Sequence, residues 1–570
     1  METSPRFSVI LIALALVVTV CAQGEADPAT TSTRATIPAT TTTATLVTTT
    51  AEEERCPDAF CVVYHIQPEA KWSDGTPVTA SDFVYTHEVL VDPLNEAAVG
   101  VGHDLITGSE IIDDKTVLFS FSEVYGPWQT LFEVVLPRHV LAGADSGIPS
   151  GLALTTTSGP FVLHEWVPGD RIILERNLRY WPVNDPLSGS PLGDVDEIHF
   201  VFPDSVRNML RDLEDGEIDL INPRPLDWIV DEVGAMEGVT HDLGPGPFWE
   251  HIDFNHDDPL LSQKWVREAI SLAIDREALL EGTVRTVDPE ASSLDSSIWM
   301  ANSLNYQPNF VDGYDPEMAE QVLVDHFCER GDDDVYSCRG RRMSFVWATT
   351  LGDEFRETHF ELAQEALEAI GVELVGDFMT PSELFSSEVF FGGPDVWQII
   401  NFSWKAAADP HLGNSTYFCE GAAPSGFGAL NVNRYCNPDV DSLVHSTNGQ
   451  ADQAERVRTY NEADAAYLED LALIPLYQKP AFLAWNAELT GPELNISRST
   501  DLWNVAAWFG KEIVVIALDS EPESLNPIMP HDTSTAMVLA AMLSGAFGID
   551  PTLEFRPVLI ESAETFVSDS

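Results

Sequence analysis

The chain has 570 residues, of which 44% are hydrophobic, so it can bury the cores of two or three domains and is not a disordered protein. It carries 92 acidic residues against 29 basic ones, which gives a formal net charge of -63. Such a surface repels phosphate backbones and anionic lipid headgroups, which excludes nucleic acid as a partner. A solubilising acidic shell, as suits a saline habitat, explains this charge without reference to any ligand.

The first 55 residues have the composition of export signals. Residues 1–21 contain Arg6 and then an apolar run too short to span a membrane comfortably, which is typical of a signal peptide. The run ends in VTVC at 18–21, which resembles a lipobox and predicts lipidation of Cys21. Secretion without a lipid is the alternative, because Val20 stands where a small residue is usual. Residues 22–55 are rich in Thr, Ala and Pro and predict a flexible tether.

Six further cysteines form three couples that are close in sequence. Couples of this kind with one cysteine left over are typical of an exported protein that has disulfide bonds and one modified thiol. Seven free thiols are the alternative. No couple has the CxxC spacing of a zinc site. The couples are Cys56 with Cys61, Cys328 with Cys338, and Cys419 with Cys436.

Residues 62–90 predict a strand, a turn and an amphipathic helix. Side chains of two kinds alternate through residues 62–66, as in a strand whose two faces differ. Asp74-Gly75 is a turn signal, and Thr79 or Ser81 can cap the helix that follows. The later chain predicts further strands and helices in an α/β arrangement. Strands are expected at 116–121, 196–202, 343–348, 372–374, 395–402 and 511–518, and helices at 206–213, 266–274, 360–370 and 533–543.

Three segments resemble motifs of extracellular solute-binding protein family 5, the peptide- and nickel-binding receptors of ABC importers. They are YHIQPEAKWSDGTPVTASDFV at 64–84, SGPFVLHEWVPGDRIILERNLRYW at 158–181 and VREAISLAIDR at 266–276. Gln67 departs from the family, which usually has Lys or Arg there. The resemblance implies an α/β, two-lobed periplasmic-binding-protein-like fold (type II, cluster C-like) with mixed sheets and a hinge near Asn255.

The opening segment of that family is absent before residue 62, and similar motifs occur at the end of the chain. PESLNP at 522–527 and RPVLIESAE at 556–564 resemble the family's first loop and the segment that precedes its Tyr-His-Ile strand. We therefore expect a circular permutation, in which residues 555–567 pair with the strand that begins at Val62. A truncated tandem duplication or a misplaced gene boundary is the alternative, with residues 511–570 opening a missing second copy.

The expected organisation divides the mature chain between two lobes. The ranges are a signal peptide and lipobox at 1–21, a disordered tether at 22–55, lobe I at 56–255, lobe II at 256–475, a return to lobe I at 476–510, and a permuted N-terminal segment of lobe I at 511–570.

The resemblance implies a receptor that closes its lobes over a small peptide or similar solute and delivers it to an ABC permease. In a dry cleft the carboxylate of Asp409 could pair the α-amino group of a peptide, and aromatic side chains could supply stacking area. A structural role for Asp409, capping a helix before Pro410, is the alternative. The expected ligand-binding residues are Trp404, Asp409, Tyr417, Phe248, Trp249 and Asn526.

Two other functions remain open. A secreted hydrolase is one, although the sequence has no GxSxG, HExxH, Walker A or dinucleotide motif. Binding of nickel or another solute is the second, for which His251 and His256 are weak support. No catalytic residue, metal site or cofactor is expected. We expect an extracytoplasmic monomer that touches the membrane only through a lipid on Cys21.

Overall fold

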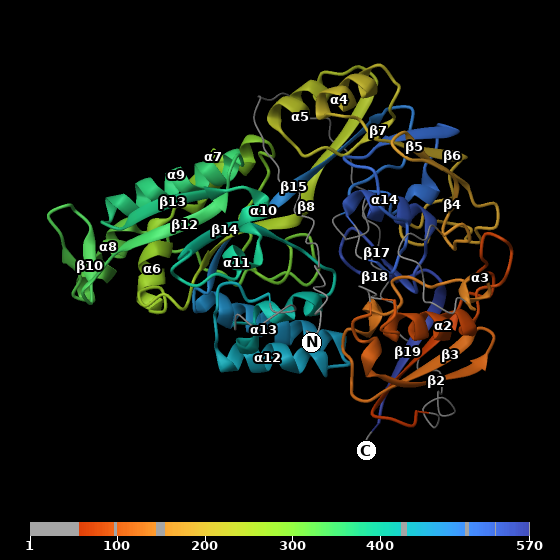
Figure 1. The fold of residues 1–570 in the computed structure, drawn as a ribbon, viewed down its shortest axis with the longest axis horizontal. Coiled ribbons are helices and arrows are strands. Elements are labelled where there is room, and N and C mark those ends of the chain that lie inside the picture. The colour runs from red at the N-terminus through yellow and green to blue at the C-terminus, as the bar shows by residue number, and fades with distance from the viewer. Residues whose placement is uncertain are drawn as a thin grey trace, which may run out of the picture.

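Two lobes joined by a pair of long strands make up the molecule (Figure 1). The computed structural model describes residues 56–95, 100–143, 154–422, 430–495, 501–529 and 532–568, so the signal peptide, Cys21 and the tether lie outside the described residues. We call the residues before the middle of β8 (Val239–Phe254) and after the middle of β15 (Leu473–Asn486) lobe I, and the residues between these two points lobe II. Within the described ranges, no helix is long and apolar enough to cross a membrane.

A ten-stranded mixed sheet runs through both lobes in the order β13-β12-β14-β8-β15-β7-β16-β6-β5-β4. This arrangement confirms the predicted two-lobed α/β fold with mixed sheets. Strands β12, β13 and β14 are parallel in lobe II, and β16 is parallel to β6 and β7 in lobe I. The bounds are β4 Phe161–Val167, β5 Arg171–Arg176, β6 Glu197–Val201, β7 Leu220–Ile221, β12 Ser344–Thr350, β13 Glu373–Met379, β14 Ile399–Lys405 and β16 Ile513–Ala517.

The strands cross between the lobes where their ladder is interrupted. Residues 239–245 of β8 pair with residues 480–486 of β15, and residues 249–253 pair with residues 473–478. The register shifts between Gln478 and Pro480, because proline has no N–H to donate. Asn255, where a hinge was expected, follows β8 within lobe II and donates from its side chain to the carbonyl of Trp397 at 3.2 Å.

A four-stranded antiparallel sheet, in the order β19-β1-β3-β2, forms the base of lobe I. Helix α2 (Ala80–Val91) covers it and begins with a capping box between Thr79 and Asp82, so this end of the chain has the predicted strand, turn and helix. The C-terminal strand β19 pairs with β1 along its whole length, which confirms the prediction for residues 560–567, whereas residues 555–557 of the predicted segment form β18 and pair with β17. The bounds are β1 Phe60–Ile66, β2 Ile106–Asp113, β3 Thr116–Phe121 and β19 Ile560–Val567.

The segment from residue 511 to residue 568, of which all but 530 and 531 are described, is central to the packing of lobe I. Strand β16 lies between β6 and β7, and helix α14 (Thr533–Met542) packs against β4. Asp532, and not Thr533 or Ser534 as expected, caps α14 by accepting from the Thr535 N–H at 2.7 Å. The remaining elements of lobe I are α3 Arg138–Leu141, α4 Val206–Glu214, α5 Asp227–Gly234, β17 Phe547–Ile549 and β18 Phe555–Pro557, with short 3-10 turns at His103–Leu105, Trp128–Thr130 and Val505–Ala507.

Lobe II places helices on both sides of its part of the sheet around a large apolar core. The three cysteine couples are joined as disulfide bonds, two of them in this lobe. The helices are α6 Lys264–Ala273, α7 Arg276–Gly282, α8 Pro316–Asp325, α9 Glu354–Ala369, α10 Pro381–Leu384, α11 Ser387–Phe390, α12 Pro438–Asn448 and α13 Gln453–Glu469. Short elements are the 3-10 turns Val284–Thr286, Pro410–Thr416 and Cys419–Ala422, and the strands β9 Glu329–Arg330, β10 Tyr336–Cys338 and β11 Arg341–Arg342.

Candidate functional site

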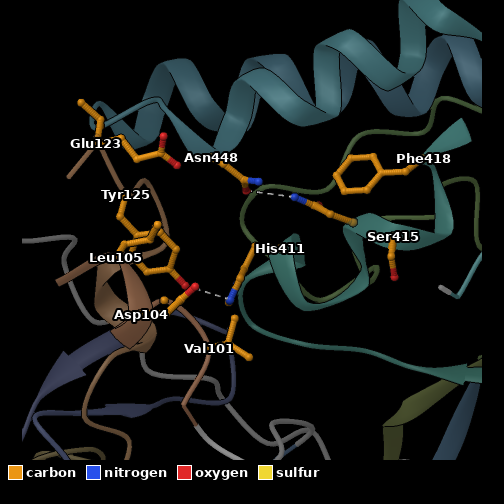
Figure 2. Close-up of a pocket in the computed structure, with 12 residues that line it drawn as sticks. Val101, Asp104, Leu105, Glu123, Tyr125, His411, Ser415, Phe418 and Asn448 are labelled. Atoms are coloured by element: carbon orange, nitrogen blue, oxygen red, sulfur yellow. Dashed lines mark hydrogen bonds between the residues drawn. The ribbon is translucent and has the colours of Figure 1, made fainter. Parts of the chain in front are cut away.

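A cavity of about 290 Å³ lies where the base of lobe I meets lobe II (Figure 2). Lobe I lines it from the segments before β2 and after β3, and lobe II from the loop that follows β14 and the end of α12. Clefts between two lobes are common places for small-molecule sites. The residues that matter most for its chemistry are Asp104, Glu123, Tyr125, His411, Asn414 and Phe418.

Tyr125 presents the cavity with a hydroxyl group on a fixed ring. Its ring stacks parallel to that of Phe121, with centroids 6.4 Å apart, and is 5% exposed. Gly102 lies against the ring, where an added Cβ would come within 2.6 Å of Tyr125 atoms, so only glycine permits this approach. Burial raises the pKa of Tyr125, so the phenol stays protonated and can donate.

His411 reaches the cavity from lobe II and points toward Tyr125 in Figure 2. Its Nδ1 is 3.1 Å from Oδ1 of Asp409, and its Nε2 is 3.3 Å from the hydroxyl of Tyr125. Because an ionised carboxylate only accepts, Nδ1 carries a proton and donates to Asp409, and in the tautomer with this single proton Nε2 accepts from the Tyr125 hydroxyl. The contact therefore links the lobes across the cavity.

Asp409 holds this imidazole in place from within lobe II. It caps the 3-10 turn Pro410–Thr416 by accepting from the His411 N–H at 3.0 Å. Its carboxylate also receives the guanidinium of Arg456, whose Nη2 is 2.7 Å from Oδ1. Burial alone would raise the pKa of Asp409, but Arg456 and the hydrogen bond from His411 hold it well below its usual range. Asp409 is thus ionised and already satisfied.

The two lobes also touch through backbone groups beside the cavity. The Gly126 N–H donates to the Asn448 carbonyl at 2.6 Å, and Gln453 donates from Nε2 to the Gly126 carbonyl at 2.9 Å. A Cβ on Gly126 would come within 2.7 Å of the carbonyl oxygens of Thr447 and Gln450. Glycine is therefore required for this close approach.

The remaining lining suits a small polar solute. Asn414 is buried and donates to Asn448 Oδ1 at 3.1 Å, while its own Oδ1 accepts from Tyr460 at 3.0 Å. Phe418 offers a ring that stacks on His445 at 3.9 Å. Asp104 and Glu123 contribute carboxylates from the lobe I side. The cavity can therefore offer hydrogen bonds, a ring face and negative charge. Among the described residues, no three His, Cys, Asp or Glu side chains are grouped to hold a metal ion.

A second set of polar groups is buried at the crossing of the strands. Glu250 of β8 contacts Lys479 Nζ at 3.2 Å and Arg356 Nε of α9 at 2.6 Å. Ser403 of β14 donates to the same carboxylate at 2.5 Å. Burial alone would raise the pKa of Glu250, but the two cations hold it well below its usual range. These contacts fix β8, β14 and α9 together next to the crossing.

The residues expected to bind ligand lie in three places. Trp249 pairs with Trp404 across β8 and β14, and Phe248 pairs with Lys405, so three of the four expected aromatic residues are neighbours in lobe II. Trp249 and Trp404 are 4% and 9% exposed. Tyr417 is buried and donates its hydroxyl to the Ser297 carbonyl at 2.9 Å.

Asn526 is the expected residue that lies in lobe I. It is 1% exposed, and its Oδ1 accepts from the Ile528 N–H at 3.3 Å within the loop between β16 and α14. Of the expected set, Asp409 and Tyr417 come nearest to the cavity, through their chain neighbours His411 and Phe418. Sequence reasoning did not single out Tyr125, His411 or Asn414, because no local pattern marks them.

Comparisons with known proteins agree with this architecture. A model of the bacterial extracellular solute-binding proteins, family 5 Middle, matches residues 45–422. The oligopeptide-binding protein OppA of Mycobacterium tuberculosis is 27% identical over 439 residues, which cover 75% of this chain and 71% of that protein.

Two solved structures have the same fold. The periplasmic EDTA-binding protein EppA is 21% identical with a TM-score of 0.66, and the match covers 79% of this chain and 85% of that one. The oligopeptide-binding protein AppA of Bacillus subtilis, in complex with a nonapeptide, is 22% identical with a TM-score of 0.57 over 79% of this chain and 87% of that one.

Proposed function

Because this chain belongs to the bacterial extracellular solute-binding proteins of family 5, it is a solute receptor of an ABC importer and not an enzyme, and we propose that it captures a small peptide between its lobes. The cavity between Tyr125 and His411 is the proposed capture site. Closure of the lobes would be favoured by a ligand that contacts both, because only the closed form offers both sets of groups.

The contact between Tyr125 and His411 carries this proposal. It joins the two lobes at the edge of the cavity, and each partner is held by further contacts in its own lobe. A peptide has backbone donors and acceptors at regular spacing, which suit the second N–H of the Asn414 amide and the acceptor lone pairs of the Tyr125 hydroxyl oxygen. The name of the Mycobacterium relative, an oligopeptide-binding protein, favours the same class of ligand.

Native mass spectrometry of the purified protein, followed by calorimetry, tests the proposal. Libraries of di-, tri- and pentapeptides are the probes, with a nickel–histidine chelate and nickel alone as competing ligands. We expect a retained or added peptide to bind with one-to-one stoichiometry and to be recovered intact. Binding of the chelate without any peptide would replace the proposed ligand class, and peptide turnover would overturn the assignment as a receptor.

We also propose that residues 511–568 are a permuted N-terminal segment that completes lobe I. The position of β16 between β6 and β7, and of β19 beside β1, supports this. Permutation is physically mild, because folded chain ends are often close together and loop closure costs grow slowly with length.

The proposed location is the outer face of the cell membrane, with a lipid on Cys21 and residues 22–55 as tether. A monomer would suffice, because one chain supplies both lobes of the capture site. Metabolic labelling with a fatty acid checks the lipid, with Cys21→Ser as control, and light scattering of the purified protein checks the monomer. Release of unlabelled protein into the medium would favour the secreted alternative.

A further inference from the structure

A second contact between the lobes comes from the C-terminal segment. Strands β17 and β18 form a two-stranded hairpin on the side of lobe I that faces lobe II (Figure 1), and we call residues 550–554 between them the hairpin tip. The base of the hairpin is anchored in lobe I, where Phe547 meets Trp128 at a ring distance of 5.7 Å and Ala546 donates to the Phe132 carbonyl. The tip is thus a rigid extension of lobe I.

Leu553 carries the tip into lobe II. Its side chain is 4% exposed and belongs to the cluster of buried apolar residues that forms the core of lobe II. All other buried members of this cluster among the described residues lie between positions 249 and 477. Ile549, at the end of β17, packs against the same cluster. Beside it, Asn302 of lobe II donates from Nδ2 to the Pro551 carbonyl at 2.9 Å. Apolar and polar contacts therefore cross between the lobes at one point.

The tip is built to present this side chain in one orientation. Asp550 accepts from the Thr552 N–H at 2.9 Å and from Arg556 Nε at 2.8 Å, which ties the two ends of the tip together. Leu553 itself has φ of 65°, in the left-handed region that a leucine rarely adopts. Such a conformation persists where the surroundings hold it, and here the buried side chain supplies the compensating contact.

We propose that Leu553 is a positioning residue for solute capture, which holds the two lobes together by inserting into the core of lobe II. Opening the lobes withdraws this side chain into water, so its burial favours the closed form in which both sides of the capture site meet. The consequence for affinity rests on the proposed function, whereas the consequence for the distance between the lobes does not.

The test measures that distance directly in the full chain. Spin labels are attached to Val183→Cys in lobe I and Val311→Cys in lobe II, in a protein that also carries Cys21→Ser. The two replaced side chains are 88% and 85% exposed. Pulsed electron paramagnetic resonance then measures the distance between the labels, which increases when the lobes open. We expect Leu553→Ala to shift the distribution toward longer distances with no ligand added, and Leu304→Ala, which removes the same atoms from a side chain 72% exposed, to leave it unchanged. Equal distributions for Leu553→Ala and the wild type would overturn the proposal.

Affinity gives a second readout once a peptide has been identified. Because the ligand binds the closed form, we expect Leu553→Ala to weaken peptide binding by about tenfold or more, the factor that corresponds to exposing one leucine side chain. Unchanged affinity would contradict the proposal. If the wild type binds no peptide, the capture function fails while the distance measurement still decides the role of Leu553. If Leu553→Ala does not fold, Asn302→Ala takes its place, because it removes the hydrogen bond from lobe II to the Pro551 carbonyl of the hairpin tip. Longer distances between the lobes would support the proposal that the hairpin tip holds them together, and unchanged distances would overturn it.

Discussion

The carboxylate of Asp409 and the guanidinium of Arg456 form a buried ion pair in lobe II, with Nη2 2.7 Å from Oδ1 and side chains 6% and 3% exposed. Arg456 also donates from Nε to the Thr447 carbonyl at 3.0 Å, so α12, α13 and the 3-10 turn at Asp409 are tied together. A peptide amino group that used Asp409, the role expected from the sequence, would have to compete with Arg456. In the structure, the carboxylate instead orients His411 toward Tyr125.

Removing the cation from this pair should be costly. We expect Arg456→Met to lower the free energy of unfolding by about 3 to 5 kcal/mol, because it leaves the Asp409 carboxylate buried without its charge partner. Urea unfolding followed by circular dichroism measures the change. The double variant with Asp409→Asn should recover much of the loss, and a cost below about 1 kcal/mol in the single variant would mean that water or another cation compensates Asp409.

The hydroxyl of Tyr125 should matter for capture more than for stability. Tyr125→Phe keeps the ring against Phe121 and removes the contact with His411, so we expect peptide affinity to fall by about 2- to 10-fold, the range of one neutral hydrogen bond. Calorimetry with the tightest peptide from the libraries measures this. The matched control is Tyr314→Phe on an exposed tyrosine, and equal affinities for the two variants would remove Tyr125 from the site.

The pair formed by His87 of α2 and His103 of the 3-10 turn that precedes β2 should make the protein less stable in acid. Burial, and then the neighbouring His87, lower the pKa of His103 to about 3, while an unfolded histidine has a pKa of about 6.5. Between these values the unfolded chain binds a proton that the folded protein does not, so the free energy of unfolding falls as the pH drops from about 6.5 toward 3. Above pH 6.5 this contribution no longer changes.

Urea unfolding at pH 7.5, 6, 5 and 4 checks the acid effect. We expect His103→Gln to lose stability less steeply than the wild type below pH 6.5, by about 1 kcal/mol per pH unit, which is close to the limit for one titrating group. His164→Gln, at a side chain 53% exposed, is the control and should follow the wild type. Parallel curves for all three proteins would show that the pair does not control the acid response.

The C-terminal segment should be needed for folding, and its place in the chain should not. Residues 57–510 alone lack β16 and β19, so β6, β7 and β1 each lose one of their two neighbouring strands and expose an unpaired edge. We therefore expect aggregation or a much lower melting temperature than for residues 57–570. Moving residues 511–568 ahead of residue 57 through a short flexible linker should restore both the melting temperature and peptide binding. Equal melting temperatures and equal peptide binding for residues 57–510 and residues 57–570 would contradict the permutation.

Much of the fold could be predicted because strand alternation and helix caps depend on residues that are close together in the sequence. The alternation at 62–66 and the capping residues at 79–82 specify β1 and α2 through contacts within a few residues. The pairing of β19 with β1 was predictable from motif order, although the strands are far apart in sequence. Boundaries were less accurate where tertiary packing decides them: α9 begins at Glu354, earlier than the expected 360, because Asp353 caps it.

The capture site could not be predicted in the same way. Tyr125 and His411 are 286 residues apart, and each stands in a segment that would fit an ordinary loop. Asp409 was visible in the sequence as an acid before a proline, but the sequence does not reveal that Arg456 would take its charge. Leu553 looks like a surface turn residue until the neighbouring lobe is in place.

The sequence by itself determined the family, the two-lobed α/β architecture and the pairing of the two chain ends, because strand alternation, turn residues and motif order act locally or in sequence order. The tertiary structure alone decided which groups line the cavity, which charges are already neutralised and which side chains cross between the lobes. The reason is physical: burial, ion pairing and desolvation depend on neighbours that only the folded chain brings together.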